Sequence, residues 1–418
     1  MKKIKNSIIT LMKTGFFHIF TGNILIKAVS FISSFLVVRI LTKDEYAYFA
    51  YADNLYAYII LFSGISLSPA FLKISSEYGD RQIAKSLFYF CSRLGSLIQI
   101  ILTVFLVLYA FFGNLTFEGS KLLIIALFVT PCLDFLLQMI QSYNRFSLRN
   151  DIFAKTAVLN AVILSVLTIF LVYFIGILGL PLARIIAYII SILWGWKHSD
   201  IDELPNLSID KIYRKKTIYL GISITIATIF SSIMPLNEIF LVNILLKDAV
   251  ITANFKAASL LPSQLLIITN SVILFVFPLL SKKASNKFRF NLILKYSFLN
   301  FIIVMLLGLI GIILTPLIVN FMYGVNYSDA IPLSYMLWIV RIVNTGIRMV
   351  PMNMLPAIGK EKFSAYFSVV TCVVHFVLDY YFILSFGIYG IAYASIFVYV
   401  ISAITYWIVL KKWSGKDD

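Results

Sequence analysis

A chain of 418 residues that is 61% hydrophobic and 13% charged is not a soluble globular protein, in which about half of the residues are apolar and about a quarter are charged. The same composition excludes intrinsic disorder, which requires low hydrophobicity and high charge. The formal net charge of +16 would suggest nucleic acid in a soluble protein, but in a chain this apolar it indicates membrane topology, and we expect no nucleic-acid partner.

Twelve apolar runs are each long enough to cross a bilayer as a helix, which takes roughly 20 residues. The first follows a basic start, as in a signal peptide, but it is too long and no cleavage site of small residues follows it, so we count it as a span. We therefore predict an all-α integral membrane protein with spans at residues 17–41, 46–71, 86–112, 121–142, 152–175, 177–196, 218–245, 254–280, 292–320, 331–355, 362–386 and 388–410.

Lysine and arginine are distributed unequally between the two sides of this topology. The N-terminus, the even-numbered connections and the C-terminus together carry 25 of them, whereas the odd-numbered connections carry 4. The positive-inside rule places the basic side in the cytoplasm. Both termini are then cytoplasmic, as an even number of spans requires.

The connections are short, and none is large enough to form a soluble domain. The longest, residues 197–217, is cytoplasmic, and the sequence contains no phosphate-binding GxxxxGK[ST] loop. Cys91, Cys132 and Cys372 lie in apolar runs without metal-ligand spacing, and we interpret them as small buried hydrophobic residues. We expect neither an enzyme nor a bound cofactor or metal.

A weak internal repeat relates the two halves at an offset of 211 residues. Residues 176–191 match residues 387–402, with identical residues at eight positions that include Gly176, Gly179, Tyr188 and Ser191. Each half then holds six spans and enters the membrane in the same direction. This predicts two six-helix bundles, residues 1–196 and 218–418, related by a pseudo-two-fold axis along the membrane normal, with residues 197–217 as linker and a substrate site between the bundles.

Four short sequence patterns lie at turns of this topology: residues 39–48, 321–330, 355–362 and 387–390. In these patterns and in its twelve spans the chain resembles the multidrug/oligosaccharidyl-lipid/polysaccharide exporter superfamily, and within it the O-antigen and polysaccharide flippases. The first pattern has Ala47 where the family usually has glycine.

The resemblance implies a bacterial inner-membrane protein of lipopolysaccharide or other polysaccharide biosynthesis. Such a protein moves an undecaprenyl-pyrophosphate-linked oligosaccharide, an O-antigen or related repeat unit, from the cytoplasmic to the periplasmic leaflet. Family members alternate between inward- and outward-facing cavities. The partners implied are the lipid-linked oligosaccharide, membrane lipids, a coupling ion (H⁺ or Na⁺), a polysaccharide polymerase and a chain-length regulator.

Eight ionisable residues lie deep inside the predicted spans. Each costs roughly 2.5–3.5 kcal/mol near the centre of a bilayer, so most must face water or one another. Their number predicts a polar cavity. They are Lys27, Arg184, Arg341, Arg348, Asp53, Asp134, Glu238 and Asp379.

Cations in such a cavity can bind the pyrophosphate of a lipid-linked sugar, because Arg and Lys form charge-assisted hydrogen bonds to phosphate oxygens. We expect Lys27, Arg341 and Arg348 to contact the head group. Arg184 and Asn23, which lies on the same helix face as Lys27, are further candidates. The alternative for each base is an ion pair with one of the acids that fixes helix packing.

Biased transport without a nucleotide site requires an ion gradient. His375 and Asp379 are four residues apart on a predicted helix and can touch. Because histidine titrates near neutral pH, this pair is a candidate for H⁺ or Na⁺ coupling, and Asp53, Asp134 and Glu238 are others. The alternative is a static polar pair between helices.

Two other functions stay open at the level of sequence. A drug/cation antiporter of the same fold would need a cavity dominated by acids, and the four deep bases argue against it. A membrane-embedded polysaccharide polymerase is disfavoured because its catalytic loop would need longer connections than these.

Overall fold

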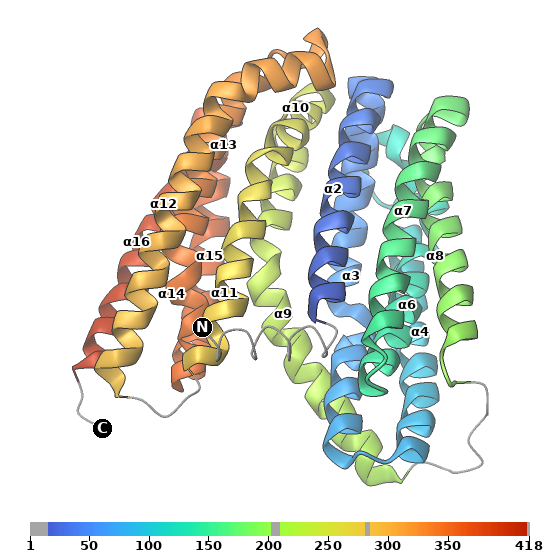
Figure 1. Cartoon of the computed structure of the whole chain (residues 1–418). Coiled ribbons are helices and arrows are strands. Elements are labelled where there is room, and N and C mark those ends of the chain that lie inside the picture. Colours follow the sequence, from blue (N-terminus) through green and yellow to red (C-terminus); the bar gives the residue numbers. More distant parts are fainter. Residues whose placement is uncertain (1–15, 202–209, 281–284, 416–418) are drawn as a thin grey trace. The chain divides into compact units, whose positions relative to one another are not determined.

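The computed structural model of the chain describes residues 16–201, 210–280 and 285–415, and within these residues it contains helices, turns and short connections but no strand (Figure 1). The prediction of an all-helical protein is confirmed for this part of the chain. The α-helices of the described residues are α2 (Phe16–Ile40), α3 (Lys43–Tyr78), α4 (Arg81–Phe112), α5 (Lys121–Ala126), α6 (Thr130–Phe146), α7 (Asn150–Ile175), α8 (Gly179–His198), α9 (Lys211–Leu246), α10 (Ala249–Leu260), α11 (Leu265–Leu280), α12 (Asn286–Ile318), α13 (Ala330–Val343), α14 (Met349–Met354), α15 (Glu361–Phe386) and α16 (Tyr389–Ser414).

Nine helical stretches of the described chain are long and apolar enough to cross a membrane. One of them, Asn150–His198, contains both α7 and α8, which pack against each other and make two spans. The halves of α9 form a further span together, and α2 contributes a shorter apolar stretch, Val29–Ile40. Counted in this way, the described helices account for the twelve predicted spans, and the fold class is confirmed.

The chain divides into two compact units, residues 1–229 and 230–418. The division falls inside α9, near residue 231, where its two halves Lys211–Phe230 and Ser232–Leu246 meet. The first half of α9 therefore packs with the first unit. The predicted bundle boundaries stay a prediction, since residues 202–209 of the predicted linker lie outside the described residues.

Aromatic side chains form much of the core of the first unit. Phe71 of α3 packs against Phe88 of α4, with ring centroids 6.0 Å apart, and stacks on Tyr143 of α6. The Tyr143 hydroxyl donates to the backbone carbonyl of Asp200. These contacts hold α3, α4 and α6 together, the helices that carry part of the site described below.

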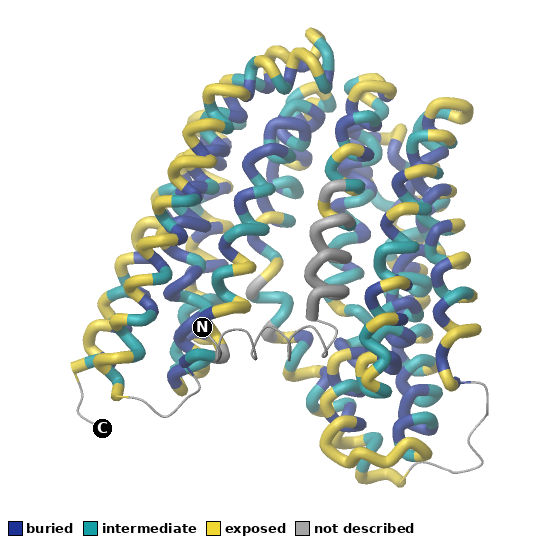
Figure 2. Tube along the Cα trace, viewed as in Figure 1, coloured by how far each residue is buried: buried dark blue, intermediate teal, exposed yellow. Residues whose placement is uncertain are grey.

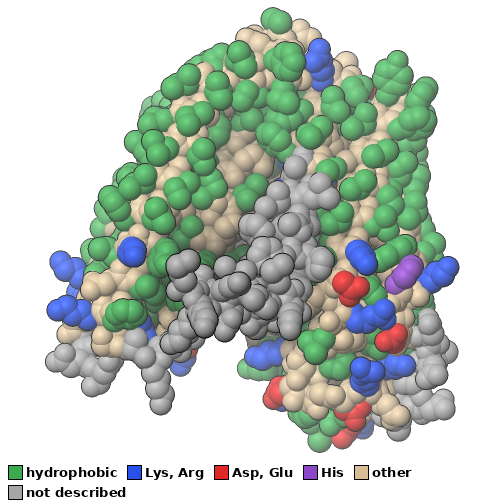
Figure 3. Space-filling view, in the orientation of Figure 1, with side chains coloured by type: hydrophobic (Ala, Val, Ile, Leu, Met, Phe, Trp, Pro, Cys, Tyr) green, Lys and Arg blue, Asp and Glu red, His purple; other side chains and the backbone are tan. Residues whose placement is uncertain are grey.

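The outward helix faces are apolar. On α7, the side chains of Val166, Phe170 and Tyr173 are each more than half exposed. Figure 2 shows such exposed stripes along the helices of each unit, and Figure 3 shows hydrophobic side chains covering them. Contiguous apolar surface of this extent does not occur on a soluble monomer, and it fits contact with lipid.

The two copies of the sequence repeat begin with the same turn. Gly176, between α7 and α8, has φ 62° and ψ −145°, and Gly387, between α15 and α16, has φ 60° and ψ −144°. Non-glycine residues essentially never adopt this conformation. The internal repeat is therefore visible in the backbone of both units, at the position that the sequence indicates.

The second glycine of each turn lets two helices approach closely. A side chain at Gly179 would collide with the backbone of Leu171, and one at Gly390 with the backbone of Phe382. Leu171 and Phe382 are themselves separated by the repeat offset. The same close approach therefore sets the packing of α7 on α8 and of α15 on α16.

A turn of left-handed backbone interrupts α3. The four residues from Ser63 to Ser66 all have φ between 34° and 56°. With its amide oxygen turned toward α3, the buried Gln99 of α4 accepts hydrogen bonds from the backbone N–H groups of Ser63 (3.0 Å) and Gly64 (2.8 Å). A single side chain thus pairs two donors that the broken helix leaves free.

Candidate functional site

Each unit contains a cluster of charged and polar side chains inside its membrane spans. In the first unit, Nη1 of Arg184 on α8 lies 2.8 Å from Oδ1 of Asp53 on α3. Both side chains are about three-quarters buried. The guanidinium also lies over the ring of Phe49, 5.6 Å from its centroid. Arg184, a predicted substrate contact, is thus held by an acid of its own unit.

Asp134 on α6 is the second acid of this cluster. Its carboxylate accepts hydrogen bonds from the Tyr188 hydroxyl (3.0 Å) and from Nε2 of Gln138 (2.7 Å). The amide oxygen of Gln138 in turn accepts from the Ser63 hydroxyl, next to the interruption of α3. This network joins α8, α6 and α3, and both oxygens of Asp134 have donors.

The second unit places His375 between two acids. Nδ1 of His375 lies 3.0 Å from Oδ2 of Asp379, one turn along α15, and Nε2 lies 3.8 Å from Oε1 of Glu238 on α9. All three side chains are buried. The imidazole stacks on the ring of Tyr399 from α16, with centroids 5.5 Å apart.

Ser395 of α16 links the histidine to Glu238. Its hydroxyl donates to Oε1 of Glu238 (3.2 Å) and lies 3.0 Å from Nε2 of His375. With Glu238 ionised, the serine proton is used in that bond, so Nε2–H of His375 must donate to the serine oxygen. In a neutral imidazole, Nδ1 would then present a lone pair to the Asp379 carboxylate at 3.0 Å.

The lone pair of Nδ1 and an ionised Asp379 carboxylate repel each other. The contact becomes favourable when a proton is added between these two atoms. Neither carboxylate oxygen of Asp379 has a hydrogen-bond donor within the described residues, although the side chain is fully buried. A buried, unpaired carboxylate is costly in a medium of low dielectric constant. Protonation of the imidazole removes that cost by forming an ion pair.

Arg348 supplies the buried base of this cluster. It lies in a π-helical segment, η6 (Asn344–Arg348), where its Nε donates to the Ser402 hydroxyl (2.9 Å) and its Nη1 to Oδ1 of Asn344 (3.1 Å). The guanidinium also lies over the ring of Tyr399. Its side chain is 6% exposed, so it is bonded inside the unit rather than offered to a ligand.

The buried charges of the second cluster do not balance. With both carboxyl groups ionised, Glu238 and Asp379 carry two negative charges, against one positive charge on Arg348. A proton on His375 or a bound cation would complete the balance. Within the described residues, no three His, Cys, Asp or Glu side chains are grouped as metal ligands.

The remaining predicted substrate contacts differ from Arg184 and Arg348. Lys27 is exposed on α2, and Arg341 of α13 is half-buried. Neither side chain forms an ion pair with an acid of the described chain. The side chain of Asn23 lies outside the described residues. Lys27 and Arg341 are thus the deep cations that have charge available for a ligand.

Sequence reasoning gave no role to Tyr188, Ser395 or Tyr399, although all three complete the clusters. A signal for them was present, because Tyr188 and Tyr399 are identical residues at the repeat offset and Ser395 corresponds to Arg184. Both clusters therefore use the same positions of the repeated helix. The tyrosine that is identical in both repeats would have indicated that these positions belong to the clusters.

The helices of the described residues, their apolar outer faces and the repeated turns define a multi-pass integral membrane protein built from two related halves. Among solved structures, it is similar to an inward-facing multidrug resistance MATE family transporter of the MOP superfamily (TM-score 0.74, 16% identity, 94% of this chain and 96% of that one). It is also similar to the lipid II flippase MurJ in an inward closed conformation, with a TM-score of 0.74 and 18% identity over 94% of this chain and 87% of that one. The MATE multidrug transporter DinF-BH gives a TM-score of 0.66 and 13% identity over 96% of this chain and 95% of that one.

Residues 12–284 match the family model described as polysaccharide biosynthesis protein. The match covers more than half of the chain, and the chain belongs to this family. No curated protein matches it. The predicted superfamily resemblance is confirmed.

Proposed function

We propose that the protein is a flippase that moves an undecaprenyl-pyrophosphate-linked oligosaccharide, such as an O-antigen repeat unit, from the cytoplasmic to the periplasmic leaflet. The polysaccharide biosynthesis family and the similarity in fold to a lipid II flippase support this class of substrate. The role is transport, without a chemical step. In this proposal the protein lies in the bacterial inner membrane with both termini cytoplasmic, and it supplies a polymerase and a chain-length regulator.

The observation that carries the proposal is the contrast between two kinds of intramembrane cation. Arg184 pairs with Asp53 and Arg348 donates hydrogen bonds to Ser402 and Asn344, whereas the side chains of Lys27 and Arg341 form neither an ion pair nor a hydrogen bond within the described residues. A cation that is kept in a membrane span without a partner costs free energy, so a function is needed to explain it. A pyrophosphate bound during transport is a counter-ion of the right sign.

Coupling to a proton gradient is the second part of the proposal. The network of His375, Ser395 and Glu238 closes with both carboxylates ionised when the imidazole carries a second proton. Uptake and release of that proton would change the net charge of a buried cluster that joins α9, α15 and α16. A conformational equilibrium of the second unit would then depend on the proton gradient. Asp53 and Asp134 are candidates for the same role in the first unit.

Complementation tests the transport function. In a strain that lacks the gene and has a known sugar unit, the wild-type chain should restore surface polysaccharide. Lys27→Ala and Arg341→Ala should insert at normal levels but leave lipid-linked repeat units in the cytoplasmic leaflet. Lys27→Arg and Arg341→Lys, which keep the charge, are the matched controls.

Three outcomes would contradict the proposal. Normal surface polysaccharide from both alanine variants would remove the head-group assignment. Drug resistance from the wild-type chain without any polysaccharide would favour a drug/cation antiporter instead. If the protein were a polymerase, its deletion would leave sugar units that reach the periplasmic side but are joined only into short chains.

A further inference from the structure

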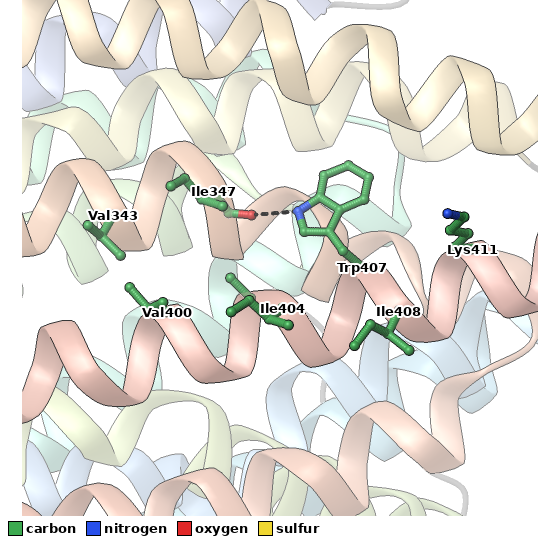
Figure 4. Close-up of a pocket in the computed structure, with 8 residues that line it drawn as sticks. Val343, Ile347, Val400, Ile404, Trp407, Ile408 and Lys411 are labelled. Carbon is green, nitrogen blue, oxygen red and sulfur yellow. Dashed lines mark hydrogen bonds between the residues drawn. The ribbon is translucent and has the colours of Figure 1, made fainter.

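Two apolar grooves lie side by side on the second unit and share one wall. The first, of about 390 Å³, runs between α16 and the η6 end of α13 and is lined by aliphatic side chains such as Val343, Val400 and Ile404 (Figure 4). The second, also about 390 Å³, lies against α12, where Leu294 and Phe298 line it. Both grooves are bordered by Ile347 and Trp407.

The wall between the grooves is held by a hydrogen bond. The Trp407 indole Nε1–H donates to the backbone carbonyl of Ile347 at 3.3 Å, in the π-helical segment η6 (Figure 4). Gly346, the preceding residue, has no side chain to fill the second groove, and a Cβ there would press on Phe301. The indole is thus fixed as a ridge with an open channel on either side.

Basic residues lie at one end of the helices that form the grooves. Lys411 lines the end of the first groove, one helical turn beyond Trp407. On α12, Lys287 lies seven residues before Leu294 and hence on the same helix face. The helices α12, α13 and α16 and the segment η6 contain no Asp or Glu. These lysines belong to the side that the positive-inside rule places in the cytoplasm, and basic side chains gather at this end of the unit in Figure 3.

The length of the first groove matches one leaflet. From Val400 to Lys411 it follows α16 for about 16 Å at 1.5 Å per residue, which is close to half of a hydrocarbon core of about 30 Å. Lys411 therefore lies at the depth of the head groups when the apolar part of the groove lies at the depth of the acyl chains.

We propose that this face binds one anionic diacyl phospholipid of the cytoplasmic leaflet, with an acyl chain in each groove and the phosphate between Lys411 and Lys287. Two channels separated by a single indole fit two chains that leave one head group, whereas a polyprenyl carrier has a single chain. The helices that line the grooves carry these lysines and no acid, which favours an anionic head group over a zwitterionic one. This site is separate from the buried clusters and does not depend on the proposed transport function.

Native mass spectrometry of the full-length purified protein with dioleoyl phosphatidylglycerol tests the proposal. We expect one tightly bound lipid, with affinity at least fivefold above that for dioleoyl phosphatidylcholine. Lys411→Gln and Lys287→Gln should each weaken binding about fivefold, which corresponds to about 1 kcal/mol per basic residue. Lys412→Gln, which changes the adjacent residue outside the grooves, should not.

A second pair of variants tests the grooves themselves. Ile404→Trp fills the first groove from an exposed position and should abolish the tight site, whereas Ile401→Trp, exposed on the same helix but outside the lining, should keep it. Equal binding of the two lipids, equal effects of the two tryptophan variants, or tighter binding of a polyprenyl phosphate at this face would overturn the proposal.

Discussion

The Arg184 guanidinium on α8 lies 2.8 Å from the Asp53 carboxylate on α3, and this pair joins two helices whose residues are 131 positions apart. Arg184→Met would remove the ion pair between this residue and Asp53. We expect the free energy of unfolding in detergent to fall by about 2 kcal/mol, the usual contribution of a hydrogen bond to a charged group.

A double-mutant cycle separates this structural role from substrate binding. The double variant Arg184→Met with Asp53→Leu should be more stable than the sum of the single changes predicts, because both charges of the pair are then replaced by apolar side chains. If Arg184→Met instead unfolds like the wild type and still loses transport, Arg184 contacts the substrate.

Hydropathy and basic connections predicted the helices and their order well, since lipid requires every span to be apolar and internally hydrogen-bonded. They could not predict which deep charges pair. Lys27, Arg184, Arg341 and Arg348 look alike in sequence, and their environments depend on helix rotations that hydropathy does not encode.

The interruption of α3 was hidden in the sequence as well. Around Ser63–Ser66 the sequence offers a single glycine, Gly64, which many helices tolerate. The left-handed turn there depends on Gln99, a residue from another helix. The bend inside α9 near residue 231 is different, because Pro235 lies one turn after it. Proline removes the helical hydrogen bond to the carbonyl four residues earlier and clashes with that carbonyl, so the sequence did contain a signal for this bend.

His375→Asn should uncouple transport from the proton gradient. Asparagine can still donate to Ser395 but cannot take up a proton next to Asp379. In proteoliposomes with an imposed pH gradient, we expect stimulation of lipid-linked oligosaccharide transport to fall about tenfold, within the usual range of coupling free energies.

His198→Asn is the matched control, because that histidine is exposed at the end of α8 and stacks on Trp194 away from the cluster. It should keep the full response to the pH gradient. Stimulation of the wild type by a sodium gradient at constant pH, unaffected by His375→Asn, would show that the coupling ion is Na⁺.

The two arginines near the end of α13 should behave differently when truncated. Arg348→Ala removes a buried guanidinium together with its hydrogen bonds to the Ser402 hydroxyl and to Oδ1 of Asn344, and should lower the free energy of unfolding by about 3–5 kcal/mol. Arg341→Ala removes a half-buried side chain without an ionic partner in the described chain and should cost less than about 1 kcal/mol. Thermal unfolding in detergent distinguishes them, and equal losses would refute the division into bonded and available cations.

The left-handed turn of α3 should depend on one amide. Gln99→Met keeps the size and the apolar stem of the side chain but removes the oxygen that pairs the backbone N–H groups of Ser63 and Gly64. Each buried donor left unpaired costs about 1–3 kcal/mol, so we expect a loss of about 2–6 kcal/mol in the free energy of unfolding.

Thr103→Val is the matched control on α4. Thr103 is as buried as Gln99, but its hydroxyl bonds to the backbone carbonyl of Gln99 within the same helix. Its replacement should cost less than about 1.5 kcal/mol, since that carbonyl keeps its helical partner. Hydrogen exchange gives a second readout, because Gln99→Met should speed exchange at Ser63 and Gly64 before it affects the rest of α3. If both variants lose the same stability and exchange at these two amides is unchanged, the turn is held by packing rather than by Gln99.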